Sequence, residues 1–235
     1  MSKKSNFIII NDAKIEQVLQ RLHQEAEKQL PRLILHYLPK LPGLFTGKGI
    51  KWDKTKTDFY KDKYIPIEPD QGIFLYLLAR SINAQNIVEF GTSFGISTIY
   101  LAAAVRDNGG GTVIGTEIVP EKVIQARQNI ADAGLDNYVD IREGDAIETL
   151  QNIDHKIDML LVDGWANLAL DILKLVDPYI RKGGIIISDN VGTFKEDLRN
   201  YVEYLQDPKN GYCSTTLNLK GGTEFAVKEI ISTLE

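Results

Sequence analysis

Short runs rich in apolar residues alternate with amphipathic stretches over most of the chain. Five such runs, bounded by glycine or other turn residues, predict strands at 86–90, 112–117, 139–143, 157–162 and 184–188. Amphipathic stretches between them predict helices. Continuous apolar strands that alternate with helices are typical of a mostly parallel sheet covered on both faces, so we expect a doubly wound α/β fold.

Both ends of the chain depart from this alternation. Apolar residues at helical spacing follow Asn11 or Asp12, either of which can cap a helix, and Pro31 predicts its end. The stretch between Pro39 and Pro69 has no clear periodicity, which favours a long functional loop or lid. Near the C-terminus, residues 214–219 and 224–230 flank Lys220-Gly221-Gly222 and predict an antiparallel hairpin.

These patterns suggest two parts. Residues 1–65 form an N-terminal helical extension with a lid that serves substrate binding or dimerisation, and residues 66–235 form one ligand-binding domain. Because the first helix has one apolar face, we expect it to pack on a second copy of the chain in a homodimer.

Composition and charge narrow the function classes. The chain has 235 residues, 43% of them hydrophobic, and a net charge of −5, which argues against general nucleic-acid binding. No apolar stretch approaches the length of a membrane span, so we expect a cytoplasmic protein without a membrane partner. Residues 1–64 hold 13 basic and 7 acidic residues. That excess is either an ordinary solvated segment or an attraction for an anionic substrate.

The turn after the first strand has the features of a ligand-binding loop. Gly91 and Gly95 let backbone amides approach a ligand, although glycines also occur in such turns for packing alone. Glu117 ends the second strand, where a carboxylate can accept hydrogen bonds from both hydroxyls of a ribose. The turn carries hydroxyl residues where a dinucleotide fingerprint has its third glycine. This favours a ligand with an amino-acid carboxylate, such as S-adenosylmethionine.

Polar residues also follow the third, fourth and fifth strands. Asp145 can accept a hydrogen bond from an adenine amino group or cap the next helix, and the sequence is equally consistent with both roles. Asp163, Asp189 and Asn190 end adjacent strands and offer the oxygen ligands that a hard cation such as Mg²⁺ prefers. Trp165 either borders an aromatic acceptor or packs in the core.

These residues together resemble the class I methyltransferases of the catechol and caffeoyl-CoA O-methyltransferase type, from about Pro66 onward. The resemblance implies a Rossmann-like methyltransferase sheet, S-adenosylmethionine as cofactor, Mg²⁺ as metal, and a small-molecule acceptor that is phenolic or a secondary metabolite. It implies the following cofactor-binding residues: Ile67, Glu89, Gly91, Thr92, Ser97, Glu117, Asp145, Ala146 and Asp163. It implies Asp163, Asp189 and Asn190 as metal ligands, and in such enzymes the metal acidifies the acceptor hydroxyl.

One position departs from that family. Its members commonly carry a lysine general base directly after the tryptophan, where this chain has Ala166. Either the metal alone acidifies the hydroxyl, or Tyr60, Tyr64 or His36 replaces the base, or the acceptor is not a catechol. Trp165, Ala166, Tyr60 and Tyr64 are our candidate acceptor residues. Methylation of nitrogen or carbon, a metal-independent reaction, and a non-catalytic nucleoside-binding role remain the alternatives.

Overall fold

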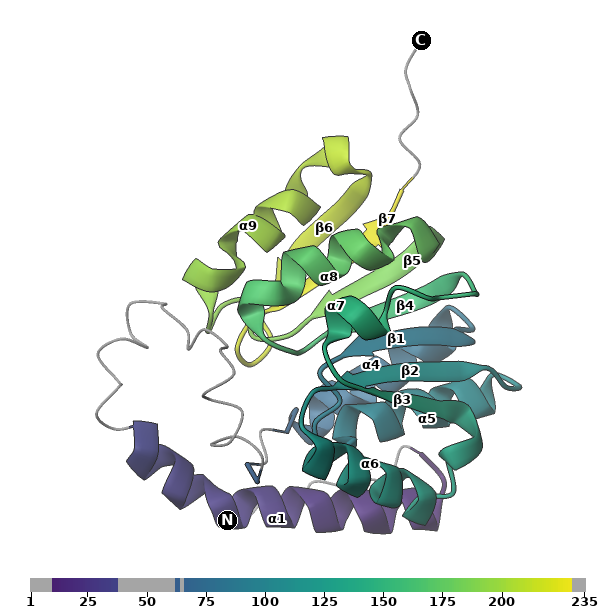
Figure 1. Ribbon diagram of the computed structural model, residues 1–235, viewed down its shortest axis with the longest axis vertical. Coiled ribbons are helices and arrows are strands. Elements are labelled where there is room, and N and C mark those ends of the chain that lie inside the picture. The colour runs from purple at the N-terminus through teal and green to yellow at the C-terminus, as the bar shows by residue number, and fades with distance from the viewer. Residues whose placement is uncertain (1–9, 38–61, 64–65, 230–235) are drawn as a thin grey trace.

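The computed structural model (Figure 1) describes residues 10–37, 62–63 and 66–229. Its seven-stranded sheet has the order β3-β2-β1-β4-β5-β7-β6. The strands are β1 (Asn86–Phe90), β2 (Thr112–Glu117), β3 (Val139–Glu143), β4 (Ile157–Val162), β5 (Ile180–Ser188), β6 (Tyr212–Leu217) and β7 (Thr223–Lys228). Strands β1 to β5 are parallel, and β7 lies antiparallel to both β5 and β6. The predicted doubly wound fold with a C-terminal antiparallel hairpin is confirmed.

Helices cover both faces of this sheet. They are α1 (Ala13–Tyr37), α4 (Pro69–Ser81), α5 (Ile96–Asp107), α6 (Pro120–Asp132), α7 (Ala146–Thr149), α8 (Ala169–Val176) and α9 (Lys195–Gln206). Side chains alternate along each strand: Ile87 and Met159 pack with α4, α5 and α6, whereas Val88 and Leu160 pack with α7, α8 and α9. The central strands are therefore apolar on both faces, which explains their unbroken apolar runs. None of the described helices is both long enough and apolar enough to cross a membrane.

The parallel register brings several strand ends to one edge of the sheet. Phe90, the last residue of β1, pairs with Thr116 of β2 and Val162 of β4, and Val162 pairs with Ser188 of β5. The residues that follow these strands must therefore emerge side by side, which is where ligands bind in doubly wound sheets.

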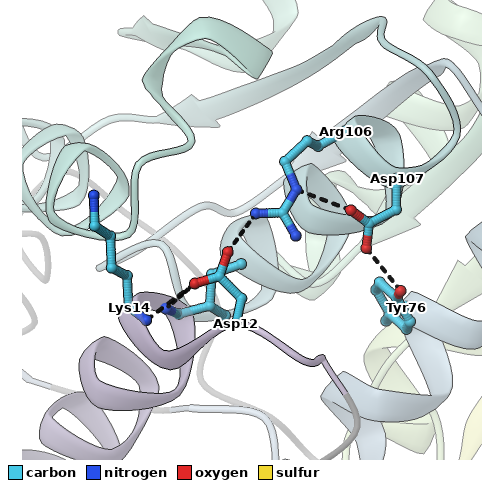
Figure 2. Close-up of polar contacts among 6 residues, drawn as sticks. Asp12, Lys14, Tyr76, Arg106 and Asp107 are labelled. Carbon is cyan, nitrogen blue, oxygen red and sulfur yellow. Dashed lines mark hydrogen bonds and ion pairs between the residues drawn. The ribbon is translucent and has the colours of Figure 1, made fainter.

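Helix α1 packs on the domain through an ion-pair network at its start (Figure 2). Asp12 caps the helix by accepting a hydrogen bond from the Lys14 backbone N–H, at 3.0 Å. The other Asp12 oxygen binds Arg106, at 2.6 Å, and Arg106 also binds Asp107, at 2.9 Å. Tyr76 donates to the second Asp107 oxygen, at 2.9 Å, so the network joins α1, α4 and α5.

The apolar face of α1 lies against its own chain. Ile15 and Leu22 are 0% and 1% exposed and belong to the same core cluster as residues of α5 and α6. This is the face that suggested dimerisation in the sequence. Its burial within one chain removes that reason for expecting a dimer, and the homodimer stays a prediction.

Predicted boundaries were wrong in the hairpin, in the first helix and in the fifth strand. The hairpin strands were predicted at 214–219 and 224–230 but lie at Tyr212–Leu217 and Thr223–Lys228. Helix α1 does not end at Pro31 but continues to Tyr37 with the proline inside it. A proline removes one helical hydrogen bond, a local cost that packing of the apolar face can offset. Strand β5 begins at Ile180 rather than Gly184, with an irregular register between β4 and β5. The prediction placed Gly184 at the start of this strand, but sheet pairing begins earlier, and Gly183 and Gly184 both lie within it.

Candidate functional site

The turn between β1 and α5 forms one wall of the site. Gly91, Ser93 and Gly95 have positive φ angles of 102°, 49° and 86°. A Cβ atom at Gly91 would lie 2.6 Å from the carbonyl oxygen of Asp163, so only glycine lets the turn pass this close to the end of β4. The resulting loop directs its backbone into a cavity at the carboxyl edge of the sheet.

The Glu89 carboxylate supports this turn from below. It is 0% exposed and accepts hydrogen bonds from the hydroxyls of Thr92 (2.9 Å), Ser97 (2.5 Å) and Thr98 (2.5 Å). Burial raises the pKa of Glu89, the charge of Glu117 raises it further, and the three hydroxyls act in the opposite direction. Glu89 therefore holds the turn and the start of α5 together through the chain's own donors.

A cavity opens above the turn. Its lining residues come from three places, the segment before α4, the turn with the start of α5, and the end of β4: Pro66, Ile67, Gly91, Thr92, Ser93, Phe94, Ile96, Ser97 and Asp163. The structure thus brings Ile67, Gly91, Thr92, Ser97 and Asp163, which the sequence predicted as cofactor neighbours, around one space. Glu89 lies beneath it rather than in its lining.

Glu117 lies beside the same turn at the end of β2. One of its oxygens accepts a hydrogen bond from the Ser93 backbone N–H and the other from that of Val119, both at 2.9 Å. Each oxygen keeps a further lone pair, so the carboxylate can still accept bonds from a ligand. Asp145 caps α7 through the Ile147 N–H, at 2.9 Å, which is the alternative that the sequence left open, and Ala146 is buried. Contact with an adenine stays a prediction for both.

Sequence reasoning missed two buried polar residues of α6. The Lys122 ammonium group donates to the Ser93 hydroxyl, at 3.2 Å, and lies 5.2 Å from the centre of the Phe94 ring. Burial lowers the pKa of Lys122, while Glu117 and Asp62 raise it. The Asn129 side chain donates to the Phe94 carbonyl oxygen, at 2.9 Å. From the sequence alone, both positions look like ordinary solvent-facing helix positions. No neighbouring residue in the sequence shows that the glycine turn packs against them.

The predicted metal ligands meet at the ends of β4 and β5. Asp163 is half-buried as a residue, and burial of its carboxyl group raises its pKa well above the ordinary value, with further contributions from the charges of Asp189 and Glu89. Burial also raises the pKa of Asp189, and this rise is opposed by hydrogen bonds and by the charge of Lys220. Two carboxylates that disfavour each other's ionisation form a site where a cation would be stabilised.

Carboxylate and amide oxygens suit a hard divalent cation, so the donor set fits Mg²⁺. Among the described residues, no group of three or more His, Cys, Asp or Glu side chains could hold a metal, and the predicted set has only two carboxylates. Asn190 has a φ of 61° and donates its amide hydrogen to Asp189, at 2.9 Å. Gln71 donates to the other Asp189 oxygen, at 2.9 Å. The Asn190 amide must turn over before its oxygen can face a cation beside Asp189.

Trp165 and Ala166 are the predicted acceptor residues that the structure describes. Trp165 and Ala166 are half-buried and pack against the cluster that contains α8 and α9. Tyr60, Tyr64 and the His36 side chain lie outside the described residues. An open groove of about 540 Å³ lies along the β6–β7 hairpin and the segment before α9, lined by Gly192, Thr193, Thr216, Leu217, Asn218, Leu219, Lys220, Gly221 and Gly222.

Known proteins resemble this chain in sequence and structure. Residues 88–191 match a family model described as a methyltransferase domain. Catechol O-methyltransferase of Niastella koreensis is 37% identical over 131 residues, covering 54% of this chain and 58% of that protein. Caffeoyl-CoA O-methyltransferase of Medicago sativa is 31% identical over 151 residues, covering 59% and 60%. The chain thus spans less than two thirds of the length of these relatives.

The same likeness extends to solved structures. An O-methyltransferase from Bacillus cereus, crystallised in complex with S-adenosylhomocysteine, has a TM-score of 0.67 and 27% identity to this chain. The match covers 77% of this chain and 93% of that one. The relatives that resemble this chain in sequence and the solved structure that resembles it in fold are therefore all O-methyltransferases.

Proposed function

Because residues 88–191 carry a methyltransferase domain and the chain resembles the class I O-methyltransferases of the catechol and caffeoyl-CoA type, we propose that it transfers a methyl group from S-adenosylmethionine to a small-molecule hydroxyl. The observation that carries this proposal is the cavity between the glycine turn and Asp163, with Glu117 beside it. We propose a phenol or a secondary metabolite as the acceptor.

The positions of the residues support the cofactor-binding roles that we propose for them. Thr92, Ser97 and the backbone of Gly91 and Ile67 border the methionine part, because they line the cavity that Glu89 supports. Glu117 accepts hydrogen bonds from the ribose through the lone pairs that its two backbone donors leave unused. Asp145 and Ala146 border the adenine.

Asp163, Asp189 and Asn190 would hold a divalent cation, which we propose is Mg²⁺. A cation at that position supplies a lowered pKa for an acceptor hydroxyl. In the transfer itself, the acceptor oxygen forms a bond to the methyl carbon as the carbon–sulfur bond breaks, and the hydroxyl proton leaves to a base. The chain positions both reactants for this in-line displacement, and positioning can supply much of the rate.

The identity of the base separates two versions of the proposal. Ala166 cannot take up a proton, so Tyr60, Tyr64 or His36 acts as base, or the hydroxyl loses its proton to water. The same alanine favours a second candidate function, transfer to nitrogen or carbon or without a metal. Trp165 and Ala166 border the acceptor in either version.

Turnover of S-adenosylmethionine with a panel of catechols, other phenols and amines tests the proposal. We expect product from a phenolic acceptor, loss of it in EDTA, and restoration by Mg²⁺. Asp189→Ala should remove turnover, while Asp171→Ala, which changes an exposed acid on α8, should leave it intact. Turnover that survives both EDTA and Asp189→Ala would contradict the metal site. Tight cofactor binding without transfer to any acceptor would favour a non-catalytic nucleoside-binding protein.

A further inference from the structure

Asn129 connects the N-terminal helix to the glycine turn. It lies on α6, is 0% exposed, and donates its amide hydrogen to the Phe94 carbonyl oxygen, at 2.9 Å. Its amide oxygen accepts a hydrogen bond from the Arg21 guanidinium group of α1, at 3.0 Å. One buried side chain thus contacts a residue more than 100 positions earlier and the backbone of the turn.

These partners fix the orientation of this amide, and Gln125 of the same helix adds a longer hydrogen bond to its oxygen, at 3.5 Å. A flipped amide would place its NH₂ group against the guanidinium donors of Arg21 and its oxygen against the carbonyl oxygen of Phe94, and neither pair can form a hydrogen bond. An aspartate at 129 could accept from Arg21 but could not donate to Phe94 when ionised. An amide is therefore the group that satisfies both neighbours at once.

The turn depends on such contacts because its conformation is unfavourable without them. Ser93 has a positive φ of 49°, a region that costs a residue with a side chain free energy. Helix α6 holds this half of the turn in two ways. Lys122 donates to the Ser93 hydroxyl, and Asn129 donates to the Phe94 carbonyl oxygen.

Helix α1 is well placed to set the Arg21 position. Its start is held by Asp12 and Arg106 (Figure 2), and its apolar face is buried. Arg21 also pairs with Asp132 of α6, at 3.0 Å, and its side chain is 43% exposed. The guanidinium group can therefore be removed without opening the core.

We propose that Asn129 is a positioning residue for the cofactor-binding turn and that Arg21, by orienting the Asn129 amide, couples the N-terminal helix to cofactor affinity. This inference rests on the proposed function, because the affinity concerned is that for S-adenosylmethionine. Neither residue is part of the cavity lining. They act through the backbone of Phe94, which borders the cavity.

Calorimetric titration of S-adenosylhomocysteine into the full chain tests the role of Asn129. Asn129→Ala and Asn129→Asp should each weaken binding about tenfold, equivalent to about 1.4 kcal/mol. They should raise the KM for S-adenosylmethionine more than they lower kcat at saturation. Equal affinity in wild type and both variants would overturn the proposal.

Asn108 provides a matched control. At the C-terminal end of α5 it also donates its amide to a backbone carbonyl, that of Ala84 at 2.8 Å, and accepts from an arginine, Arg80, at 2.7 Å. Asn108→Ala removes the same chemistry far from the turn along α5, so it should lower stability but leave ligand affinity unchanged. A loss of affinity as large as that of Asn129→Ala would show a general effect of destabilisation and overturn the proposal.

Arg21→Ala tests the coupling and avoids the buried position. It should weaken ligand binding about threefold, less than Asn129→Ala, and should add nothing in the Asn129→Ala background, because linked residues are not additive. Asp132→Ala removes the other Arg21 partner and should leave affinity unchanged. Additive effects of Arg21→Ala and Asn129→Ala would contradict the coupling.

Hydrogen exchange separates this inference from the proposed function. If wild type bound no S-adenosylhomocysteine, the proposed function would fail, and amide exchange across residues 91–97 would then test the positioning role alone. Asn129→Ala should speed exchange there and Asn108→Ala should not. Equal exchange in the two variants would overturn the inference.

Discussion

Two carboxylates at the carboxyl edge of the sheet, Glu89 and Asp163, lie in contrasting surroundings. Glu89 is fully buried but accepts three hydrogen bonds from hydroxyls of its own turn and helix. Burial raises the pKa of Asp163, and the charges of Asp189 and Glu89 raise it further. The first carboxylate is stabilised by the chain, whereas the second would be stabilised by a bound cation. A buried acid with its donors in place supports a fold, and a buried acid beside another acid indicates a ligand site.

Asp163→Asn should have the largest effect of the substitutions that test this comparison. We expect kcat for methyl transfer to fall about a thousandfold, the scale seen when a group that stabilises a transition state is removed. The free energy of unfolding of the metal-free protein at pH 7 should rise, since the substitution removes a charge beside Asp189. Steady-state kinetics and urea unfolding measure the two quantities.

Asp171→Asn is the control for that substitution, because Asp171 is exposed on α8. It should change neither quantity. A fall in both activity and stability for Asp163→Asn would contradict the idea that Asp163 is held against like charge for the sake of a ligand.

Glu89→Ala should lower the free energy of unfolding by about 3 kcal/mol, because three buried hydroxyls lose their acceptor. It should also weaken S-adenosylhomocysteine binding, since Thr92 and Ser97 line the cavity. Urea unfolding and calorimetry check these outcomes, with Glu121→Ala, an exposed acid of α6, as control. Unchanged stability would sink the supporting role of Glu89.

Ala166→Lys should raise turnover of a phenolic acceptor about tenfold, a modest part of what a well-placed general base provides. The lysine would stand where the resembling family carries its base. Asn167→Lys adds the same charge one residue later at an exposed position and should have no such effect. Turnover that falls or stays constant in Ala166→Lys, with cofactor affinity intact, would contradict a family-like acceptor geometry.

The smallest effect concerns pH. Burial raises the pKa of Glu89 in the folded chain above its ordinary value of 4.5, so the folded state holds this proton more tightly than the unfolded state. As pH rises from 4.5 through the raised pKa, the contribution of Glu89 to stability falls. Glu89→Gln lacks this contribution. Urea unfolding at several pH values should show wild type losing stability relative to Glu89→Gln as pH rises, and the opposite trend would refute the assignment.

The parts of the fold and site that follow from local pattern could be predicted from the sequence. The first four strands begin and end at the predicted residues, because each is an apolar run closed by a glycine or an acid. Once the strands are parallel, residues such as Glu117, Asp163 and Asp189 must reach one edge. The parallel arrangement and the residue types at the strand ends therefore predicted where the candidate site lies.

The parts that depend on distant packing could not be predicted. Asn129 and Lys122 have ordinary positions on an amphipathic helix, and only the tertiary structure places Ser93 and Phe94 against them. The local signal at Pro31 predicted a helix end that packing overcame, and the apolar run from Gly184 did not show that β5 begins at Ile180.

The proposed function requires that the cavity beside the glycine turn binds the cofactor. Calorimetric titration of S-adenosylhomocysteine, with EDTA and then with Mg²⁺, measures this binding. One ligand should bind per chain even in EDTA, because the hydrogen bonds of Glu89 that hold the glycine turn need no cation. Binding should weaken in Glu117→Ala, which removes the ribose acceptor, and Mg²⁺ should bind separately, at a site that Asp189→Ala abolishes. Failure of the wild-type chain to bind S-adenosylhomocysteine under either condition would contradict the account.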